Sequence, residues 1–173
     1  MITGKSIYLK EPKITDYEII KNIWEDEDTM EDVGGVILLP NDKYIMWYEK
    51  MIIKGKDRNR YFLKIDKVSN KCLGEISFHR YNINTKTAEL NIKILKRFRG
   101  QGKAKESLDL LLDYYFNTFK GSIIQDHIGI NNINGLNILI NYGFEEKYRN
   151  KEEILIELTK SKFNKIKPAL SGI

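Results

Sequence analysis

The change of hydrophobic period within residues 87–119 constrains the fold more than any other feature of the chain. Residues 87–95 (TAELNIKIL) alternate apolar and polar side chains, so that Leu90, Ile92 and Ile94 share one face of a predicted strand. A basic turn with two glycines follows, and beyond it the apolar side chains recur at steps of three and four, as in an amphipathic helix. These helical side chains are Ala104, Leu108, Leu111, Leu112, Tyr115 and Phe119. Because the apolar face of such a helix must pack on a sheet, the pattern predicts an α/β fold.

The remaining sequence predicts further strands and helices in a mixed order. Strands are predicted at residues 6–12, 60–66, 71–81, 87–95, 122–130 and 152–158. Helices are predicted after a Thr15/Glu18 capping box and at residues 42–55, 103–119 and 131–144. The three strands between residues 60 and 95 are joined by short turns and should form an antiparallel meander. We therefore predict one α/β domain with a mixed sheet over residues 1–160, followed by a basic, frayed tail at residues 161–173.

Composition narrows the class of protein. The chain has 173 residues, of which 42% are apolar and 31% charged, and a net charge of +5, as expected for a soluble globular domain. No stretch is apolar enough for a membrane span or a signal peptide, and the single cysteine, Cys72, excludes an internal disulfide. We therefore expect a cytoplasmic protein without a membrane partner. Basic residues are interleaved with acidic ones and no aromatic base-stacking motif occurs, which argues against a nucleic-acid partner.

Residues 97–105 (RFRGQGKAK) have the chemistry of an anion site. The first turn of a helix carries N–H groups without intrahelical partners and a partial positive charge. Gly100 and Gly102 let the backbone turn and let a ligand approach closely, and four basic side chains add charge. The stretch matches neither the Walker pattern nor the three-glycine dinucleotide fingerprint. It indicates a phosphate or pyrophosphate site of another kind, and a structural turn with solvent-facing basic residues is the alternative.

The same turn carries a resemblance to a known family. Arg99-Gly100-Gln101-Gly102-Lys103-Ala104 matches the Arg/Gln-x-x-Gly-x-Gly/Ala pattern of the GNAT N-acetyltransferases. Residues 130–146 (INNINGLNILINYGFEE) resemble that family's later helix, which contains an Asn and ends in Gly-Phe. The resemblance covers about residues 60–147 in the family's order. With Glu106, the turn is most similar to the branch of ribosomal-protein N-terminal and spermidine acetyltransferases.

This resemblance implies a fold and a donor site. The fold would be a central, mostly antiparallel sheet that splays between two parallel strands, with helices on both faces. Acetyl-CoA would lie in the V-shaped gap between the strands at residues 87–95 and 122–130, with its pyrophosphate on the backbone N–H groups of the glycine turn. The residues implied to bind it are Ile92, Ile94, Arg99, Gly100, Gln101, Gly102, Lys103, Ala104 and Asn132. The alternative role for Asn132 is a helix N-cap.

The resemblance also implies direct acetyl transfer from acetyl-CoA to a neutral amine, which requires a group that takes up a proton. Glu89 is the first candidate base, and Glu75 could be a base or could bind a cationic substrate. Leu139 stands where many family members have a Tyr acid, so Tyr142 is the nearest remaining candidate acid. Weaker candidates are the other titratable side chains on these strands, His79, Asp126 and His127. No pair has metal-ligand spacing, so no metal is predicted.

The acceptor is inferred from charge. Residues 24–35 (WEDEDTMEDVGG) are densely acidic, and in this family the segment between the first two helices usually borders the acceptor site. We therefore expect a cationic amine, such as a polyamine, an aminoglycoside-like amine or a peptide N-terminus, and a solvated loop is the alternative. A non-catalytic CoA-binding sensor or partner-docking module with the same fold is the alternative function. The resemblance favours a monomer or a homodimer.

Overall fold

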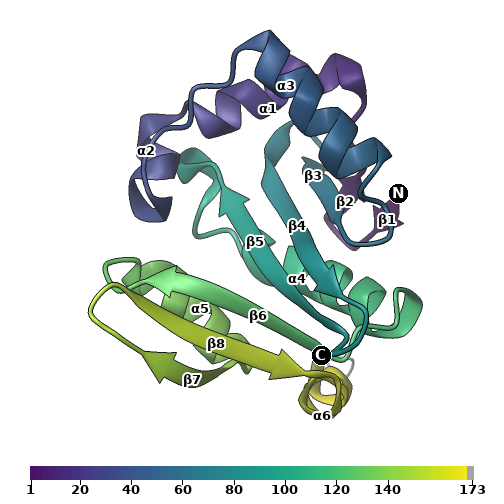
Figure 1. Cartoon of the computed structure of the whole chain (residues 1–173), viewed down its shortest axis with the longest axis vertical. Coiled ribbons are helices and arrows are strands. Elements are labelled where there is room, and N and C mark those ends of the chain that lie inside the picture. The colour runs from purple at the N-terminus through teal and green to yellow at the C-terminus, as the bar shows by residue number, and fades with distance from the viewer. Residues whose placement is uncertain (171–173) are drawn as a thin grey trace.

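The computed structural model describes residues 1–170, which form one mixed sheet with helices on both faces (Figure 1). The strands are β1 (Ile2–Thr3), β2 (Ile7–Lys10), β3 (Arg60–Asp66), β4 (Cys72–Asn82), β5 (Thr87–Ile94), β6 (Ile123–Gly129), β7 (Glu145–Arg149) and β8 (Glu153–Thr159). The α-helices are α1 (Tyr17–Trp24), α2 (Glu27–Met30), α3 (Asn41–Tyr48), α4 (Lys103–Asp113), α5 (Ile133–Tyr142) and α6 (Lys160–Leu170). Short 3-10 helices lie at η1 (Ile14–Asp16), η2 (Glu31–Val33) and η4 (Lys96–Phe98), and π-helices η3 (Glu49–Ile53) and η5 (Tyr114–Thr118) extend α3 and α4. The predicted α/β class is confirmed.

The sheet divides between β5 and β6. Its strand order is β1-β2-β3-β4-β5-β6-β8-β7, and every neighbouring pair is antiparallel except β5 and β6, which run parallel. These two strands pair only at residues 87–89 and 123–125, and then diverge into a V (Figure 1). The splayed parallel pair that the resemblance implied is therefore confirmed.

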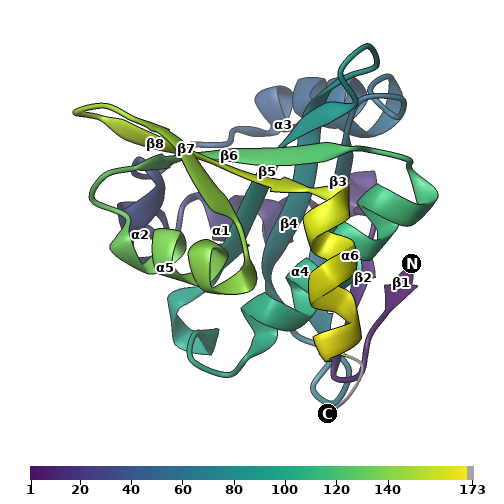
Figure 2. The same ribbon diagram turned by 90° about the horizontal axis from the view of Figure 1, so that it is seen from below.

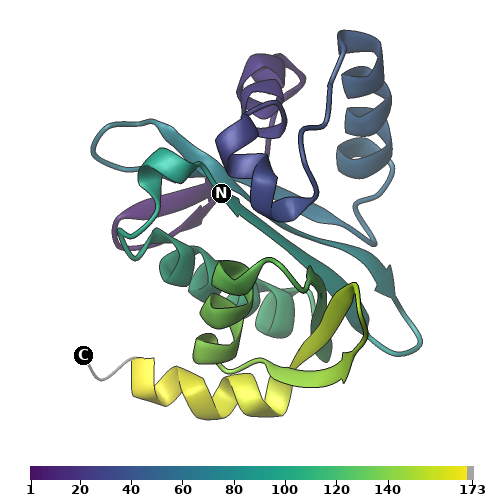
Figure 3. The same ribbon diagram turned by 90° about the vertical axis from the view of Figure 1, so that its left-hand side faces the viewer.

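Each face of the sheet has its own apolar core. Helices α1 and α3 cover one face, where Ile20, Ile23 and Tyr44 are buried with residues of β3. Helices α4, α5 and α6 cover the other face (Figure 3). The predicted apolar side of α4 faces this second core, because Leu108 and Leu111 have no exposed surface. The helix therefore packs on the sheet as its period predicts.

The described part of the C-terminal segment differs from the expected frayed tail, of which residues 171–173 lie outside the described residues. It forms α6, which lies against the end of α4 (Figure 2). Phe163 of α6 is buried, and its ring centroid lies 5.1 Å from that of Phe116. Phe163 and Ile166 pack on the apolar core from an otherwise basic segment, so its composition gave little indication of a helix.

Two other local predictions were incomplete. The edge strand β7 was not predicted, because all its residues are exposed and it shows no apolar alternation. Helix α1 begins after the short helix η1, so Thr15 does not form the predicted capping box. Instead, the Asp16 carboxylate accepts a hydrogen bond from the Lys13 backbone N–H at 2.8 Å and pairs with Lys10 at 3.0 Å.

Candidate active site

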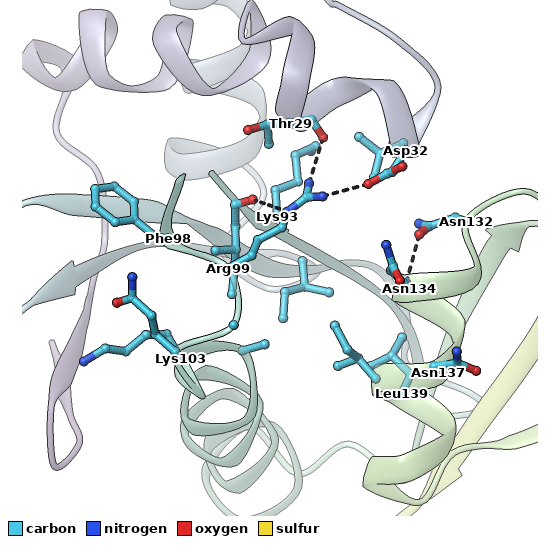
Figure 4. A pocket seen from close by; sticks show the side chains of 18 of the residues that line it. Thr29, Asp32, Lys93, Phe98, Arg99, Lys103, Asn132, Asn134, Asn137 and Leu139 are labelled. Atoms are coloured by element: carbon cyan, nitrogen blue, oxygen red, sulfur yellow. Dashed lines mark hydrogen bonds and ion pairs between the residues drawn. The ribbon is translucent and has the colours of Figure 1, made fainter. Parts of the chain in front are cut away.

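A cavity of about 410 Å³ opens where β5 and β6 separate (Figure 4). Beyond Glu89, no described residue of β5 pairs with β6, so alternate backbone N–H and C=O groups of β5 face the gap without a strand partner. Ile92 and Ile94 of β5 line the cavity. An extended ligand with amide groups could therefore hydrogen-bond along this open edge.

The glycine turn forms the next wall of the cavity. Gly100 and Gly102 have φ values of 77° and 71°, a left-handed conformation that favours glycine, and Gly102 is the N-cap of α4. The first intrahelical hydrogen bond of α4 runs from the Glu106 N–H to the Gly102 carbonyl at 3.3 Å. The N–H groups before it have no intrahelical partner and lie at the positive end of the helix dipole. The turn thus has the geometry of an anion site.

Three of the four basic side chains of this turn are already paired with carboxylates. Lys103 pairs with Asp66 at 3.2 Å, and Lys105 pairs with Asp109 at 3.3 Å. Arg99 pairs with Asp32 at 2.7 Å. An anion in the cavity would therefore be held chiefly by backbone N–H groups.

Helix α5 forms the opposite wall. Asn132 is its N-cap, and its Oδ1 accepts a hydrogen bond from the Gly135 N–H at 2.9 Å, so the alternative role considered for Asn132 is present. Its Nδ2 is a second polar group on the same cavity wall. Three further asparagines line the cavity and were not predicted to do so, although their spacing of three and four places them on one helical face. They are Asn134, Asn137 and Asn141.

The structure brings all nine residues predicted for the donor site to this one cavity. They are Ile92, Ile94, Arg99, Gly100, Gln101, Gly102, Lys103, Ala104 and Asn132. They come from β5, the turn before α4 and the start of α5, which are separated in sequence and converge at the fork. Thr29, Asp32 and Val33 also line the cavity and were not predicted to do so.

Glu75 lies beneath the cavity wall as the centre of a buried polar cluster. Its carboxylate accepts hydrogen bonds from Trp24 Nε1 at 2.8 Å, Asn91 Nδ2 at 3.0 Å, Lys93 Nζ at 2.6 Å and the Tyr61 hydroxyl. It has no exposed surface. Glu75 therefore forms a buried ion pair with Lys93. Because both of its carboxylate oxygens already accept hydrogen bonds within the chain, Glu75 is poorly placed to receive a proton or a substrate cation.

Glu89 lies at the vertex of the V, in register with Gln125 of β6. Its carboxylate lies 3.3 Å from His79 Nε2 and 3.1 Å from a terminal nitrogen of Arg80. It lines a second depression of about 380 Å³ rather than the main cavity. Burial lowers the pKa of His79, although the charge of Glu89 opposes this shift, so His79 is mainly neutral at pH 7.

Asp126 is the first residue of β6 beyond its pairing with β5. Burial raises the pKa of its carboxyl group to about 7, and the negative charge of Glu89 adds to the shift. With this pKa, the carboxyl group at the fork would change its protonation state near neutral pH. The next residue, His127, is more exposed and pairs with Glu153 at 3.1 Å.

Comparison with known proteins identifies the family. Residues 6–145 match a family model described as an acetyltransferase (GNAT) domain. The chain belongs to the GNAT acetyltransferase family. The predicted family is thereby confirmed, although no curated protein matches the chain in sequence.

Solved GNAT structures share this fold at low sequence identity. Spermidine N-acetyltransferase from Vibrio cholerae, in complex with CoA and spermine, has a TM-score of 0.81 at 20% identity and covers 92% of this chain and 98% of its own. A GNAT-family acetyltransferase from Bacillus anthracis has a TM-score of 0.77 at 19% identity, with coverage of 92% and 98%. FdhC, a nucleotide-linked sugar GNAT, has a TM-score of 0.80 at 17% identity, with coverage of 96% and 93%.

The position of the usual GNAT tyrosine is apolar in this chain. Leu139 lines the cavity from α5 and is buried. Tyr142 is directed elsewhere, because its hydroxyl donates to Asp109 Oδ1 on α4 at 2.7 Å. The structure thus does not bring Tyr142, the candidate acid, to the cavity. Burial and the neighbouring Asp109 also raise the pKa of Tyr142.

Much of the acidic segment that borders this GNAT cavity is engaged within the protein. Asp26 caps α2 by accepting from the Thr29 N–H at 3.0 Å, and Glu25 accepts from the Leu39 N–H at 3.0 Å. Asp28 pairs with Lys96 at 3.0 Å, and Asp32 pairs with Arg99. These four carboxylates are therefore less available to a cationic acceptor than the sequence suggests.

Residues 1–170 lack two features of other classes of protein. They contain no group of three or more His, Cys, Asp or Glu side chains arranged to hold a metal ion. None of their helices has the length and apolar character needed to cross a membrane.

Proposed function

We propose that this GNAT protein is an N-acetyltransferase that uses acetyl-CoA as donor and a primary amine as acceptor. The observation that carries the proposal is the fork between β5 and β6, which opens directly onto the glycine turn at the start of α4. A gap with a free strand edge at one side and an anion site at the other suits a ligand that combines amide groups with a diphosphate.

The residues of the cavity fit the donor. Backbone N–H groups from Arg99 to Ala104 would bind the diphosphate, and the free edge of β5 near Ile92 would pair with the pantetheine amides. The Asn132 amide group would add a polar contact on the opposite wall. Acetyl-CoA supplies an acetyl group that is activated as a thioester.

The protein must also remove a proton from the acceptor amine, because only a neutral amine attacks a thioester. Glu89 is our first candidate for the base, and its position at the vertex supports this role. Asp126 is the second, because its pKa of about 7 suits proton uptake at neutral pH. Glu89→Gln should lower the rate at neutral pH without a matching change in the affinity for acetyl-CoA. An unchanged pH–rate profile in that variant would mean that Glu89 is not the base, and Asp126→Asn would then test Asp126 in the same way.

For the acceptor, we propose a small cationic amine or a peptide N-terminus. Support comes from the fold shared with a spermidine N-acetyltransferase and from Glu27 and Glu31, which are exposed on the acidic segment. The pairing of Asp28 and Asp32 with basic residues makes the charge argument weaker than the sequence alone suggested.

The decisive experiment is calorimetric titration with acetyl-CoA, followed by a free-thiol release assay against polyamines, aminoglycosides and short peptides. Binding followed by thiol release with one amine class would establish the enzyme and its acceptor class. Absence of binding would overturn the proposed donor site.

A non-catalytic CoA-binding module is the second candidate function. The observation that favours it is the apolar Leu139 at the usual tyrosine position, together with the pairing of Tyr142 with Asp109. Binding of acetyl-CoA without thiol release across the whole panel would support this alternative.

A further inference from the structure

Arg99 lines the proposed donor site, but its side chain is engaged within the chain and is not free to bind an anion. Its guanidinium makes three hydrogen bonds (Figure 4). Nε donates to the Ile94 carbonyl at 3.1 Å, and the terminal nitrogens donate to Asp32 Oδ2 at 2.7 Å and to the Thr29 carbonyl at 3.3 Å. These hydrogen bonds join the end of β5 to residues 26–33, the α2–η2 segment. Because the guanidinium is rigid and planar, it holds the two parts of the chain in a fixed arrangement.

A second pair of contacts holds the same segment. The Lys96 backbone N–H donates to Thr29 Oγ1 at 3.0 Å, and the Lys96 ammonium pairs with Asp28 at 3.0 Å. The side chains of Lys96 and Asp28 are 52% and 72% exposed, so water screens their attraction. Those of Arg99 and Asp32 are only 34% and 33% exposed, so their pair is the stronger restraint.

The α2–η2 segment belongs to the wall of the donor cavity. Thr29 and Asp32 line that cavity together with the glycine turn. Asp32 therefore places a carboxylate in the wall of a site proposed for a diphosphate, and Arg99 neutralises it. The carboxylate and the phosphates of the donor would both form charge-assisted hydrogen bonds with this guanidinium, so they compete for it.

We infer that Asp32 is a positioning residue that couples the α2–η2 segment to the acetyl donor through Arg99. With Asp32 paired, Arg99 holds the segment against the cavity. Donor phosphates draw the guanidinium away from Asp32, and the segment on the side expected for the acceptor is released. This inference rests on the proposed function, because it requires CoA in the cavity.

The test compares three variants in the full chain. Asp32→Asn removes the charge that holds Arg99, and Asp32→Glu conserves it. Asp28→Asn is the matched control, because it breaks an ion pair of the same segment whose carboxylate is not among the cavity-lining groups. CoA affinity is measured by calorimetry at low and high salt, and amide hydrogen exchange of residues 26–33 is measured with and without CoA.

We expect Asp32→Asn to bind CoA about 3- to 10-fold more tightly than wild type at low salt, with a smaller gain at high salt. Exchange in the α2–η2 segment should be faster without CoA, and the increase that CoA causes in wild type should disappear. Asp32→Glu and Asp28→Asn should resemble wild type. If Asp32→Asn matched Asp28→Asn in both measurements, the inference would be wrong while the donor site stood. If wild type bound no CoA, the proposed function would fail, and this inference with it.

Discussion

Glu75 shows how the site depends on single buried residues. It accepts hydrogen bonds from Trp24, Tyr61, Asn91 and Lys93, which come from α1, β3 and β5. A buried carboxylate is stable only when such partners compensate for its lost hydration. In the folded chain both carboxylate oxygens of Glu75 are therefore engaged within the protein, although the residue looks available in the sequence.

The Glu75–Lys93 pair can be tested by removing one charge. Glu75→Gln leaves the Lys93 ammonium, whose side chain is only 11% exposed, without its counter-ion. We expect the free energy of unfolding to fall by about 3–5 kcal/mol, measured by urea denaturation. The double variant Glu75→Gln, Lys93→Met removes both charges and should recover most of this loss. Equal losses in the single and double variants would contradict this account.

Asp126 makes the stability depend on pH in a defined direction. Its pKa of about 7 in the folded chain exceeds the ordinary value of 3.8, so the folded state binds more protons between these two pH values. The contribution of Asp126 to the free energy of unfolding is therefore fully present below pH 4 and is lost as the pH rises through 7. Asp126→Asn should reduce the fall in unfolding free energy between pH 5 and pH 8 by on the order of 2 kcal/mol. The exposed Asp57→Asn is the control, and an identical pH dependence in wild type and Asp126→Asn would refute the prediction.

At the scale of elements, the turn before α4 combines backbone conformation with ligand access. Gly102→Ala forces a side chain into a left-handed conformation, which costs roughly 1–2 kcal/mol of stability, and adds a methyl group at the cavity wall. Gly35→Ala is a matched control, with a φ of 91° and open space around the added Cβ, outside the cavity lining. Both variants should lose similar stability, but only Gly102→Ala should weaken CoA binding, by about 10-fold. Equal CoA affinities in the two variants would show that the glycine turn is not part of the donor site.

At the scale of the whole molecule, the sheet has a core on each face, and the V lies between its two halves. Helix α6 contributes to one of these cores, so we propose that the domain extends beyond residue 160. Phe163→Ala should lower the free energy of unfolding by about 3–5 kcal/mol in a single cooperative transition, followed by circular dichroism. Tyr148→Ala on the edge strand β7, where the side chain is 56% exposed, should change it little. If Phe163→Ala changed the free energy of unfolding only slightly, the C-terminal segment would be a frayed tail, as the sequence predicted.

The sequence by itself determined the elements that build the site. Strand β3 spans the predicted residues 60–66, β5 and β6 lie within one residue of their predicted ends, and all nine predicted donor residues line one cavity. These features are local: the period of apolar residues records which face of an element is buried, and glycine marks a left-handed turn.

Only the tertiary structure decided which charged groups are free. Arg99 and Asp32 are 67 positions apart in the chain, and Trp24 and Glu75 are 51 apart. Neither pairing leaves a periodic trace in the sequence. The hydrogen-bond and ion-pair partners of Glu75, Tyr142 and the acidic segment were therefore not predictable from residue types and spacing. Such pairings depend on the twist of the sheet and the packing of distant elements, because side-chain hydrogen bonds and ion pairs form only at close range.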